Sequence, residues 1–80
     1  MAKYQPGQII KHNTGERYKI ILAVTHIYMT FDVYLKNEYH AGLSSWDFRY
    51  LDKHYKLSSI TLSELGLTEQ KLNQIKAEAL

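Results

Sequence analysis

Residues 17–28 read Arg-Tyr-Lys-Ile-Ile-Leu-Ala-Val-Thr-His-Ile-Tyr, and they hold the longest unbroken apolar run of the chain, Ile20 to Val24. The even positions from Tyr18 to Val24 are apolar, and Ile21 and Ala23 add apolar side chains at odd positions. Because successive side chains of a strand point to opposite faces, this segment presents apolar groups on both faces. Such a pattern indicates a central strand that is covered twice, or one that coils around a barrel. We therefore expect residues 17–28 to form the longest strand of a β-rich fold.

The segment before this strand predicts a short strand and a compact turn. Gln8 to His12 is the short strand, and Asn13 to Glu16 is the turn. Gly15 is placed in the turn to take a positive φ, which glycine adopts without steric penalty. The body of the protein is therefore expected to begin with a hairpin.

The segment after the long strand predicts a tight turn over Tyr28 to Thr30, followed by a strand with one clear core face. Apolar residues at odd positions alternate there with polar or amphipathic residues at even positions, namely Phe31, Val33 and Leu35 against Asp32, Tyr34 and Lys36. If the odd positions face the core, Tyr34 points outward together with Asp32 and Lys36.

Smaller elements are expected next. A turn and a short strand are expected over Asn37 to Leu43. A helical turn follows over Trp46 to Leu51, capped by Ser44 or Ser45. The last strand contains Tyr55 and Leu57. Residues 61–80 differ in character, because Leu, Glu, Lys, Gln and Ala dominate them and favour helix. We expect one domain, made of a β-rich body over residues 1–60 and a helical extension over residues 61–80 packed on it.

The extension carries its own start and stop signals. Thr61 to Glu64 fits a capping box, and Gly66 fits a helix stop. Thr68 is then expected to cap a second helix that runs to the C-terminus. The apolar stripe of that helix is narrow, which favours a helix lying on the body and not a coiled coil.

The composition excludes several classes of protein. The chain has 80 residues, no cysteine, and a net charge of +2 from 10 basic and 8 acidic residues. Without cysteine there is no disulfide scaffold, zinc ribbon or thiol nucleophile. No apolar run approaches the roughly 20 residues of a membrane helix, and the N-terminus lacks an apolar signal core. We therefore expect a globular cytoplasmic protein that does not enter the membrane.

The sequence also lacks the signatures of catalysis and metal binding. No phosphate-cradling glycine loop, nucleophile elbow or paired carboxylates appear. The four histidines are evenly spaced by fourteen residues, at His12, His26, His40 and His54, and none forms a close ligand pair. We expect no enzyme activity, no catalytic residue, no metal and no cofactor, although a long-range pair such as His26 with His40 is left open.

The order of the expected elements resembles the SH3-like barrel. The opening Tyr4-Gln5-Pro6-Gly7-Gln8-Ile9-Ile10-Lys11, followed by Gly15 and Tyr18 to Ile21, resembles the first hairpin of such barrels. Trp46 to Leu57 resembles the short helix and closing strand of small SH3-like proteins of phages and mobile elements. The resemblance covers residues 4–60 and implies a small barrel of about five strands with a C-terminal helix. It also implies a binding module that engages and modulates a host or defence protein.

Binding to a protein is the leading functional hypothesis. Tyr, Trp and Arg are enriched at binding hot spots, and here they concentrate between Tyr28 and Tyr55. The residues expected to make the contact are Tyr34, Tyr39, Arg49, Tyr50 and Lys53. An exposed edge strand or the C-terminal helix offers a second route, through pairing with a partner or a second copy.

Nucleic-acid binding is the alternative. Small β-barrels with exposed rings and cations stack bases and neutralise phosphates. The residues that would serve this role are Tyr34, Lys36, Tyr39, Trp46, Arg49, Tyr50, Lys53 and Lys56. Asp47 and Asp52 offset these cations, and a strong phosphate binder carries a denser basic cluster. Protein binding is therefore favoured.

Overall fold

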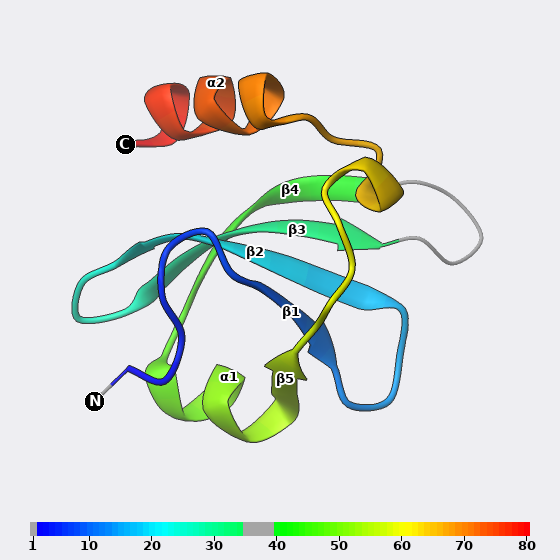
Figure 1. The fold of residues 1–80 in the computed structure, drawn as a ribbon. Coiled ribbons are helices and arrows are strands. Elements are labelled where there is room, and N and C mark those ends of the chain that lie inside the picture. Colours follow the sequence, from blue (N-terminus) through cyan, green and yellow to red (C-terminus); the bar gives the residue numbers. More distant parts are fainter. Residues whose placement is uncertain (1, 35–39) are drawn as a thin grey trace.

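The computed structural model describes residues 2–34 and 40–80, and within them five antiparallel strands form one open sheet (Figure 1). The strands are β1 (Ile9–His12), β2 (Arg17–Val24), β3 (Tyr28–Tyr34), β4 (His40–Trp46) and β5 (Tyr55–Leu57). Their order across the sheet is β4-β3-β2-β1-β5. The helices are α1 (Phe48–His54), the short 3-10 helix η1 (Ser63–Leu65) and α2 (Glu69–Ala79). The expected mainly-β fold with a C-terminal helix is confirmed, whereas a closed barrel is not, because β4 and β5 do not pair.

The central position of β2 explains its apolar sequence. β2 pairs with β1 on one side and with β3 on the other, and it is buried on both faces. Tyr18, Ile20 and Leu22 lie in a core cluster with residues of η1 and α2. Ile21 lies in a second cluster with Leu51 of α1. Of the two expected alternatives, the central strand covered on both faces is therefore the one observed.

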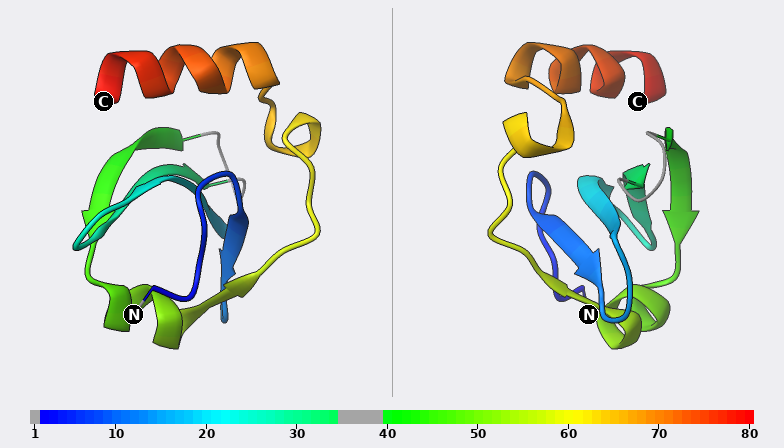
Figure 2. Two further views of the ribbon diagram at one scale, coloured as in Figure 1. Left: turned by 60° about the vertical axis from the view of Figure 1, so that its left-hand side comes forward. Right: turned by 90° about the vertical axis from the view of Figure 1, so that its right-hand side faces the viewer.

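Two hydrophobic cores lie on opposite faces of the curved sheet. The core on the α2 face joins Val33 and the β2 residues to Leu65, Leu67 and Leu72. The core on the α1 face is built from the fully or nearly fully buried residues Tyr4, Ile10, Ile21, Tyr28, Leu51 and Tyr55. Figure 2 shows α2 lying across one face of the sheet and α1 at the opposite end of the molecule. The buried apolar side chains of β2 and β3 therefore lie in one of these two cores.

The boundaries of β2 and β3 differ from those expected. β2 ends at Val24, and the turn is Thr25 to Ile27, where the Thr25 amide donates to the Ile27 carbonyl at 3.0 Å. Tyr28 to Thr30, expected as a turn, begins β3 instead. The buried Tyr28 pairs with Val24 and with Trp46. Burial of this large ring on the sheet therefore overrides the local turn signal.

The outward orientation expected for Asp32 is also wrong. Phe31 and Val33 face a core as expected, the one on the α2 face, but the opposite face of β3 is also covered, by side chains of β2, β4 and α1. Asp32 is only 9% exposed, and its neighbour Tyr34 is half-buried. The alternation of β3 thus separates the apolar Phe31 and Val33 from a second interior face that holds the ring of Tyr28 and the polar Thr30 and Asp32.

Two local signals differ from those expected. The residues with positive φ among the described glycines are Gly7 (93°) and Gly66 (77°), and Gly15 is not one of them. Ser44 and Ser45 lie inside β4, so neither can cap α1. Asp47 caps α1 instead, because its carboxylate accepts a hydrogen bond from the Arg49 amide at 2.8 Å. An Asp at this position satisfies an otherwise unpaired N–H of the first turn.

The start and stop signals of the C-terminal segment are confirmed. The Thr61 amide donates to Glu64 Oε1 at 3.2 Å, and the Glu64 amide donates to Thr61 Oγ1 at 3.3 Å, which are the reciprocal bonds of a capping box. Gly66 ends η1, and Thr68 caps α2 by accepting from the Lys71 amide at 3.1 Å. None of the helices in the described part of the chain is long and apolar enough to cross a membrane.

Candidate functional site

A row of aromatic rings crosses the α1 end of the molecule, and we call it the ring row. It consists of Trp46, Tyr50, His54, His12 and Tyr55. Trp46 and Tyr50 stack with ring centroids 4.9 Å apart, and Tyr50 lies 4.6 Å from His54. His54 is parallel to His12 at 6.4 Å, and His12 meets Tyr55 edge-on at 5.0 Å. Tyr50 is 41% exposed, so the row faces solvent at this ring.

A buried cation lies beneath this row. The Lys19 ammonium is 4.4 Å from the centroid of Trp46 and 5.5 Å from that of Tyr55. It also lies 2.8 Å from Asp32 Oδ2, and Lys19 as a whole is only 1% exposed. An ammonium over an aromatic face is attracted by the ring quadrupole, and the attraction grows when water is excluded. Lys19 therefore joins both ends of the ring row to the sheet.

Hydrogen bonds extend from Asp32 to Trp46. Thr30 donates to Asp32 Oδ1 at 2.8 Å, and Ser44 donates to Asp32 Oδ2 at 2.7 Å. The Trp46 indole N–H donates to Ser44 Oγ at 2.6 Å. No buried polar side-chain atom among the described residues lacks a hydrogen-bond partner. A fully satisfied network of this kind fixes a side chain in one orientation, and here that side chain is Trp46.

Helix α1 positions the outer part of the site. Residues four apart lie on the same side of a helix, so Tyr50 shares a side with His54, and Arg49 shares one with Lys53. Arg49 and Lys53 are exposed, and no described carboxylate lies within salt-bridge distance of either. The helix is anchored by Asp52, which accepts a hydrogen bond from the Tyr28 hydroxyl at 2.8 Å. Helix α1 therefore carries two exposed cations and the exposed ring of Tyr50 on adjacent sides.

Four of the five binding residues expected from the sequence fall within the described residues. Arg49, Tyr50 and Lys53 lie together on α1. Tyr34 lies at the end of β3, on the face of the sheet that α1 covers, and the Arg17 guanidinium is 5.7 Å from its ring centroid. Arg17 and Tyr34 also line a pocket of about 360 Å³ beside the β1–β2 turn. Tyr39 lies outside the described residues.

Burial changes the acid–base properties of two rings in the row. Burial lowers the pKa of His12, and the positive charges of Arg17, His54 and Lys19 lower it further. The Thr14 amide donates to His12 Nδ1 at 3.1 Å, which places the ring proton on Nε2 when His12 is neutral. Burial raises the pKa of Tyr55 to about 12, with a contribution from the charge of Asp32. His12 and Tyr55 are therefore both held in their neutral forms.

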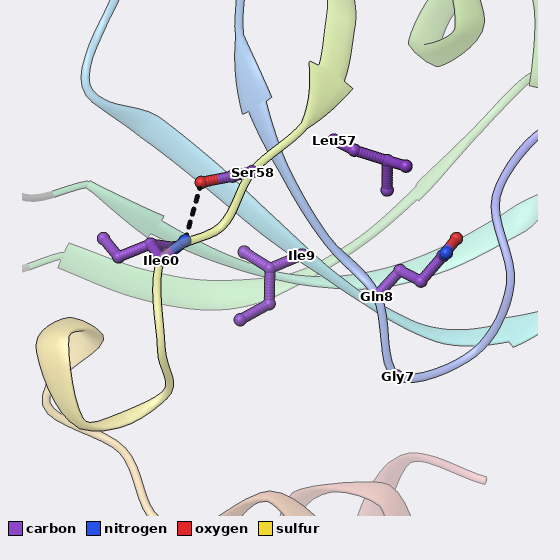
Figure 3. A pocket seen from close by; sticks show the side chains of 6 residues that line it. All are labelled: Gly7, Gln8, Ile9, Leu57, Ser58 and Ile60. Atoms are coloured by element: carbon purple, nitrogen blue, oxygen red, sulfur yellow. Dashed lines mark hydrogen bonds between the residues drawn. The ribbon is translucent and has the colours of Figure 1, made fainter.

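A separate pocket of about 350 Å³ lies at the other end of β5 (Figure 3). Its lining residues are Gly7, Gln8, Ile9, Leu57, Ser58 and Ile60. The Ser58 hydroxyl accepts a hydrogen bond from the Ile60 amide at 3.2 Å. These residues offer apolar contact and hydrogen bonds but no group that titrates near neutral pH. Among the described residues there is also no cluster of three or more metal-binding side chains.

Sequence reasoning missed the interior half of this site. Lys19 and Asp32 were not proposed as site residues. Lys19 stands between Tyr18 and Ile20 in an otherwise apolar segment, and a charged residue in such a segment indicates a buried charge that is paired. The contact between His12 and His54 joins residues 42 positions apart and left no signal in the spacing of the histidines. Scans of the chain against protein-family models, curated proteins and solved structures found no match.

Proposed function

We propose that this chain is a non-enzymatic protein-binding module that uses the ring row and the flanking cations of α1 as its contact surface. The observation that carries the proposal is the exposed ring of Tyr50, which stacks on Trp46, contacts His54 and shares α1 with the exposed Arg49 and Lys53. Aromatic rings and Arg dominate the binding energy of protein interfaces. The Lys19–Asp32–Ser44 network already holds Trp46 in place, so little ordering remains to be done on binding.

The charge distribution supports an acidic partner. Residues 1–57 hold eight basic and five acidic residues, whereas residues 58–80 hold two basic and three acidic ones. The body thus has a net charge of +3 and the C-terminal segment −1. Complementary charge speeds association and fixes orientation. We therefore propose a partner segment that offers carboxylates to Arg49 and Lys53 and an apolar group to Tyr50.

A partly open SH3-like barrel is the fold that we propose for this module. The strand order β4-β3-β2-β1-β5, with a short helix between β4 and β5, agrees with the resemblance at residues 4–60. Lys19 contacts Trp46 on β4 and Tyr55 on β5, so side chains occupy the space between the two edges. The prediction that the partner is a host or defence protein comes from the resemblance and stays a prediction.

Nucleic-acid binding would use the same surface, because Tyr50 could stack on a base and Arg49 and Lys53 could contact phosphates. The carboxylates of Asp47 and Asp52 lie on the same short stretch of chain as these cations. They reduce the attraction for a polyanion, whereas a protein segment can place its carboxylates selectively. This contrast favours the protein partner.

Selection from a random peptide library reveals which peptides the surface prefers, with no partner chosen in advance. We expect selected peptides to be enriched in Asp and Glu beside an apolar residue, and to bind with micromolar affinity. Tyr50→Ala should weaken their binding at least about tenfold, the loss expected of a hot-spot ring. Arg49→Glu and Lys53→Glu should also weaken it, whereas Lys71→Glu, at an exposed position of α2, should not.

Two outcomes would overturn the proposal. One is that the selected peptides bind wild type and Tyr50→Ala equally well. The other is that no peptide is enriched while a labelled single-stranded or duplex oligonucleotide binds at low salt and is released as the salt concentration rises. The second outcome would establish the nucleic-acid function in place of the protein one.

A further inference from the structure

The outer edge of β4 is a second surface, separate from the exposed rings of α1. β4 is the last strand of the sheet, and no described strand pairs with its outer side. It runs for seven residues in unbroken register with β3, from the pair Tyr34–His40 to the pair Tyr28–Trp46. Figure 2 shows β4 at the margin of the sheet, away from β1 and β5. Among the described residues no strand adjoins its outer N–H and C=O groups, so a further strand can bond to them there.

β4 lacks the features that usually protect an edge strand. Natural edges are short, charged, bulged or interrupted by proline, and these features prevent pairing with other chains. The sequence of β4, His-Ala-Gly-Leu-Ser-Ser-Trp, contains no Lys, Arg, Asp, Glu or Pro, and its register shows no bulge. β5, at the opposite edge, has only three residues and carries Lys56. The contrast singles out β4 as an edge suited to pairing.

We propose that β4 pairs with β4 of a second copy of this chain, antiparallel and centred on Leu43, so that the two sheets join into one. This register places Gly42 opposite Ser44, Ala41 opposite Ser45 and His40 opposite Trp46, so no carboxylate or ammonium group meets its own copy. Leu43 comes opposite its own copy. Because β4 carries no Lys, Arg, Asp or Glu, a second copy of the chain meets no charge repulsion at this edge.

The surroundings of Leu43 suit this arrangement. Leu43 is 56% exposed, although it shares the α2 face of the sheet with Phe31. It borders a pocket of about 170 Å³ whose other apolar residues are Met29 and Ala79. In an antiparallel pair, directly opposed Cβ atoms lie about 4.5–5.5 Å apart. The partner's leucine would therefore cover Leu43 and the rim of this pocket, removing apolar surface from water.

The dimer is expected to be weak. One strand pair and two leucines bury much less than the roughly 1,000 Å² that marks a stable interface. A dissociation constant on the order of 100 µM fits so small a contact. The protein would thus be mostly monomeric when dilute and dimeric when concentrated, so the test must span both regimes.

Sedimentation equilibrium over roughly 10 µM to roughly 1 mM brackets this affinity. We expect the weight-average mass to rise from the monomer value of 9.4 kDa toward twice that value. Leu43→Lys should remain monomeric throughout, because two ammonium groups would oppose each other at the centre of the contact. Leu57→Lys is the matched control, since Leu57 is 57% exposed and lies on the other edge strand. This control should dimerise like wild type.

Amide hydrogen exchange adds a second readout that does not depend on mass. The outward amides of β4 should gain protection in concentrated wild type and in Leu57→Lys, and should not gain it in Leu43→Lys. The proposal fails if wild type stays monomeric at the highest concentration. It also fails if Leu43→Lys dimerises normally while Leu57→Lys does not. Tyr50→Ala should leave dimerisation intact and Leu43→Lys should leave peptide binding intact, so this inference and the proposed function can fail separately.

Discussion

Lys19 Nζ lies 2.8 Å from Asp32 Oδ2 inside the sheet, with the Trp46 ring 4.4 Å from the same ammonium. The two residues face each other on neighbouring strands, because Lys19 of β2 pairs with Asp32 of β3. Burial lowers the pKa of Lys19, and the hydrogen bond and charge of Asp32 counteract this shift. This ion pair therefore couples the stability of the sheet to the placement of Trp46 in the binding surface.

Removing one partner of the Lys19–Asp32 ion pair should lower the unfolding free energy strongly. Lys19→Met leaves the Asp32 carboxylate buried without its counter-charge, and losses of about 3–5 kcal/mol in unfolding free energy are typical of such changes. Lys19→Met combined with Asp32→Asn should recover much of the loss, because an amide can still bond to Thr30 and Ser44 without carrying charge. Urea unfolding measures both variants. A cost below about 1 kcal/mol for Lys19→Met would mean that the pair is solvated.

Ser44 should matter more than its neighbour Ser45. Ser44 connects Asp32 to the Trp46 indole N–H, whereas Ser45 is exposed on the other face of β4. Ser44→Ala should lower the unfolding free energy by about 1–2 kcal/mol and release the indole N–H, with a change in its proton chemical shift and faster exchange with water. Ser45→Ala is the control and should change neither. Equal effects at the two positions would show that the hydrogen bonds of Ser44 do not hold Trp46.

The Tyr28 hydroxyl fixes the N-terminal segment to α1. It accepts hydrogen bonds from the amides of Lys3 at 2.8 Å and Tyr4 at 3.0 Å, and it donates to Asp52. Tyr28→Phe should therefore speed hydrogen exchange at both amides and cost about 1–3 kcal/mol, as for unpaired buried polar groups. Tyr18→Phe is the control, since its hydroxyl donates to the exposed Glu16 at 3.2 Å and does not hold the N-terminal segment. Unchanged exchange in Tyr28→Phe would contradict this account.

Alkaline pH should weaken the fold through Tyr55. Its pKa is raised from 10.0 to about 12 by burial, so between these values the unfolded chain has released a proton that the folded protein retains. Stability from this group is complete below pH 10.0 and declines as the pH rises toward 12, by up to about 3 kcal/mol. Burial also raises the pKa of Tyr4, Tyr18 and Tyr28, so these three residues further decrease the stability of the fold at alkaline pH.

At lower pH, the titration of Lys19 changes the unfolding free energy in the opposite direction to that of Tyr55. Its pKa is lowered from 10.5 by burial, so the unfolded chain binds more protons there and stability rises with pH up to about that value. The unfolding free energy of wild type and Tyr55→Phe should therefore be compared above pH 10.5. The variant should lose less stability with rising pH than wild type. Parallel curves for the two proteins would contradict the raised pKa of Tyr55.

Local patterns predicted the existence of most elements but not their ends. The double-faced apolar run predicted β2 as a central strand, and the Thr61–Glu64 and Thr68 caps were predicted correctly, because these signals are local. The start of β3 was missed, since the burial of Tyr28 depends on Tyr4 and Phe48, which are distant in sequence. The cap of α1 was assigned to a serine because β4 was expected to end too early.

The candidate site also has one part that the sequence predicted and one part that it did not. Arg49, Tyr50 and Lys53 were named from the sequence because Tyr and Arg are enriched at binding hot spots, and the structure places all three on α1. Their support was not predicted, because the pairing of β2 with β3 brings Lys19 to Asp32, and the pairing of β1 with β5 brings His12 to Tyr55. Such contacts depend on strand register, which a single sequence pattern specifies only weakly.

The fluorescence of Trp46 during a titration with a selected acidic peptide tests the proposed binding surface most directly. Trp46 is the only tryptophan of the chain, and its ring stacks on Tyr50, so a ligand at the ring row must change its emission. We predict a saturable change with a micromolar midpoint that Tyr50→Ala weakens at least about tenfold. Calorimetric binding of the same peptide with no change in Trp46 emission and equal affinity for Tyr50→Ala would contradict the account.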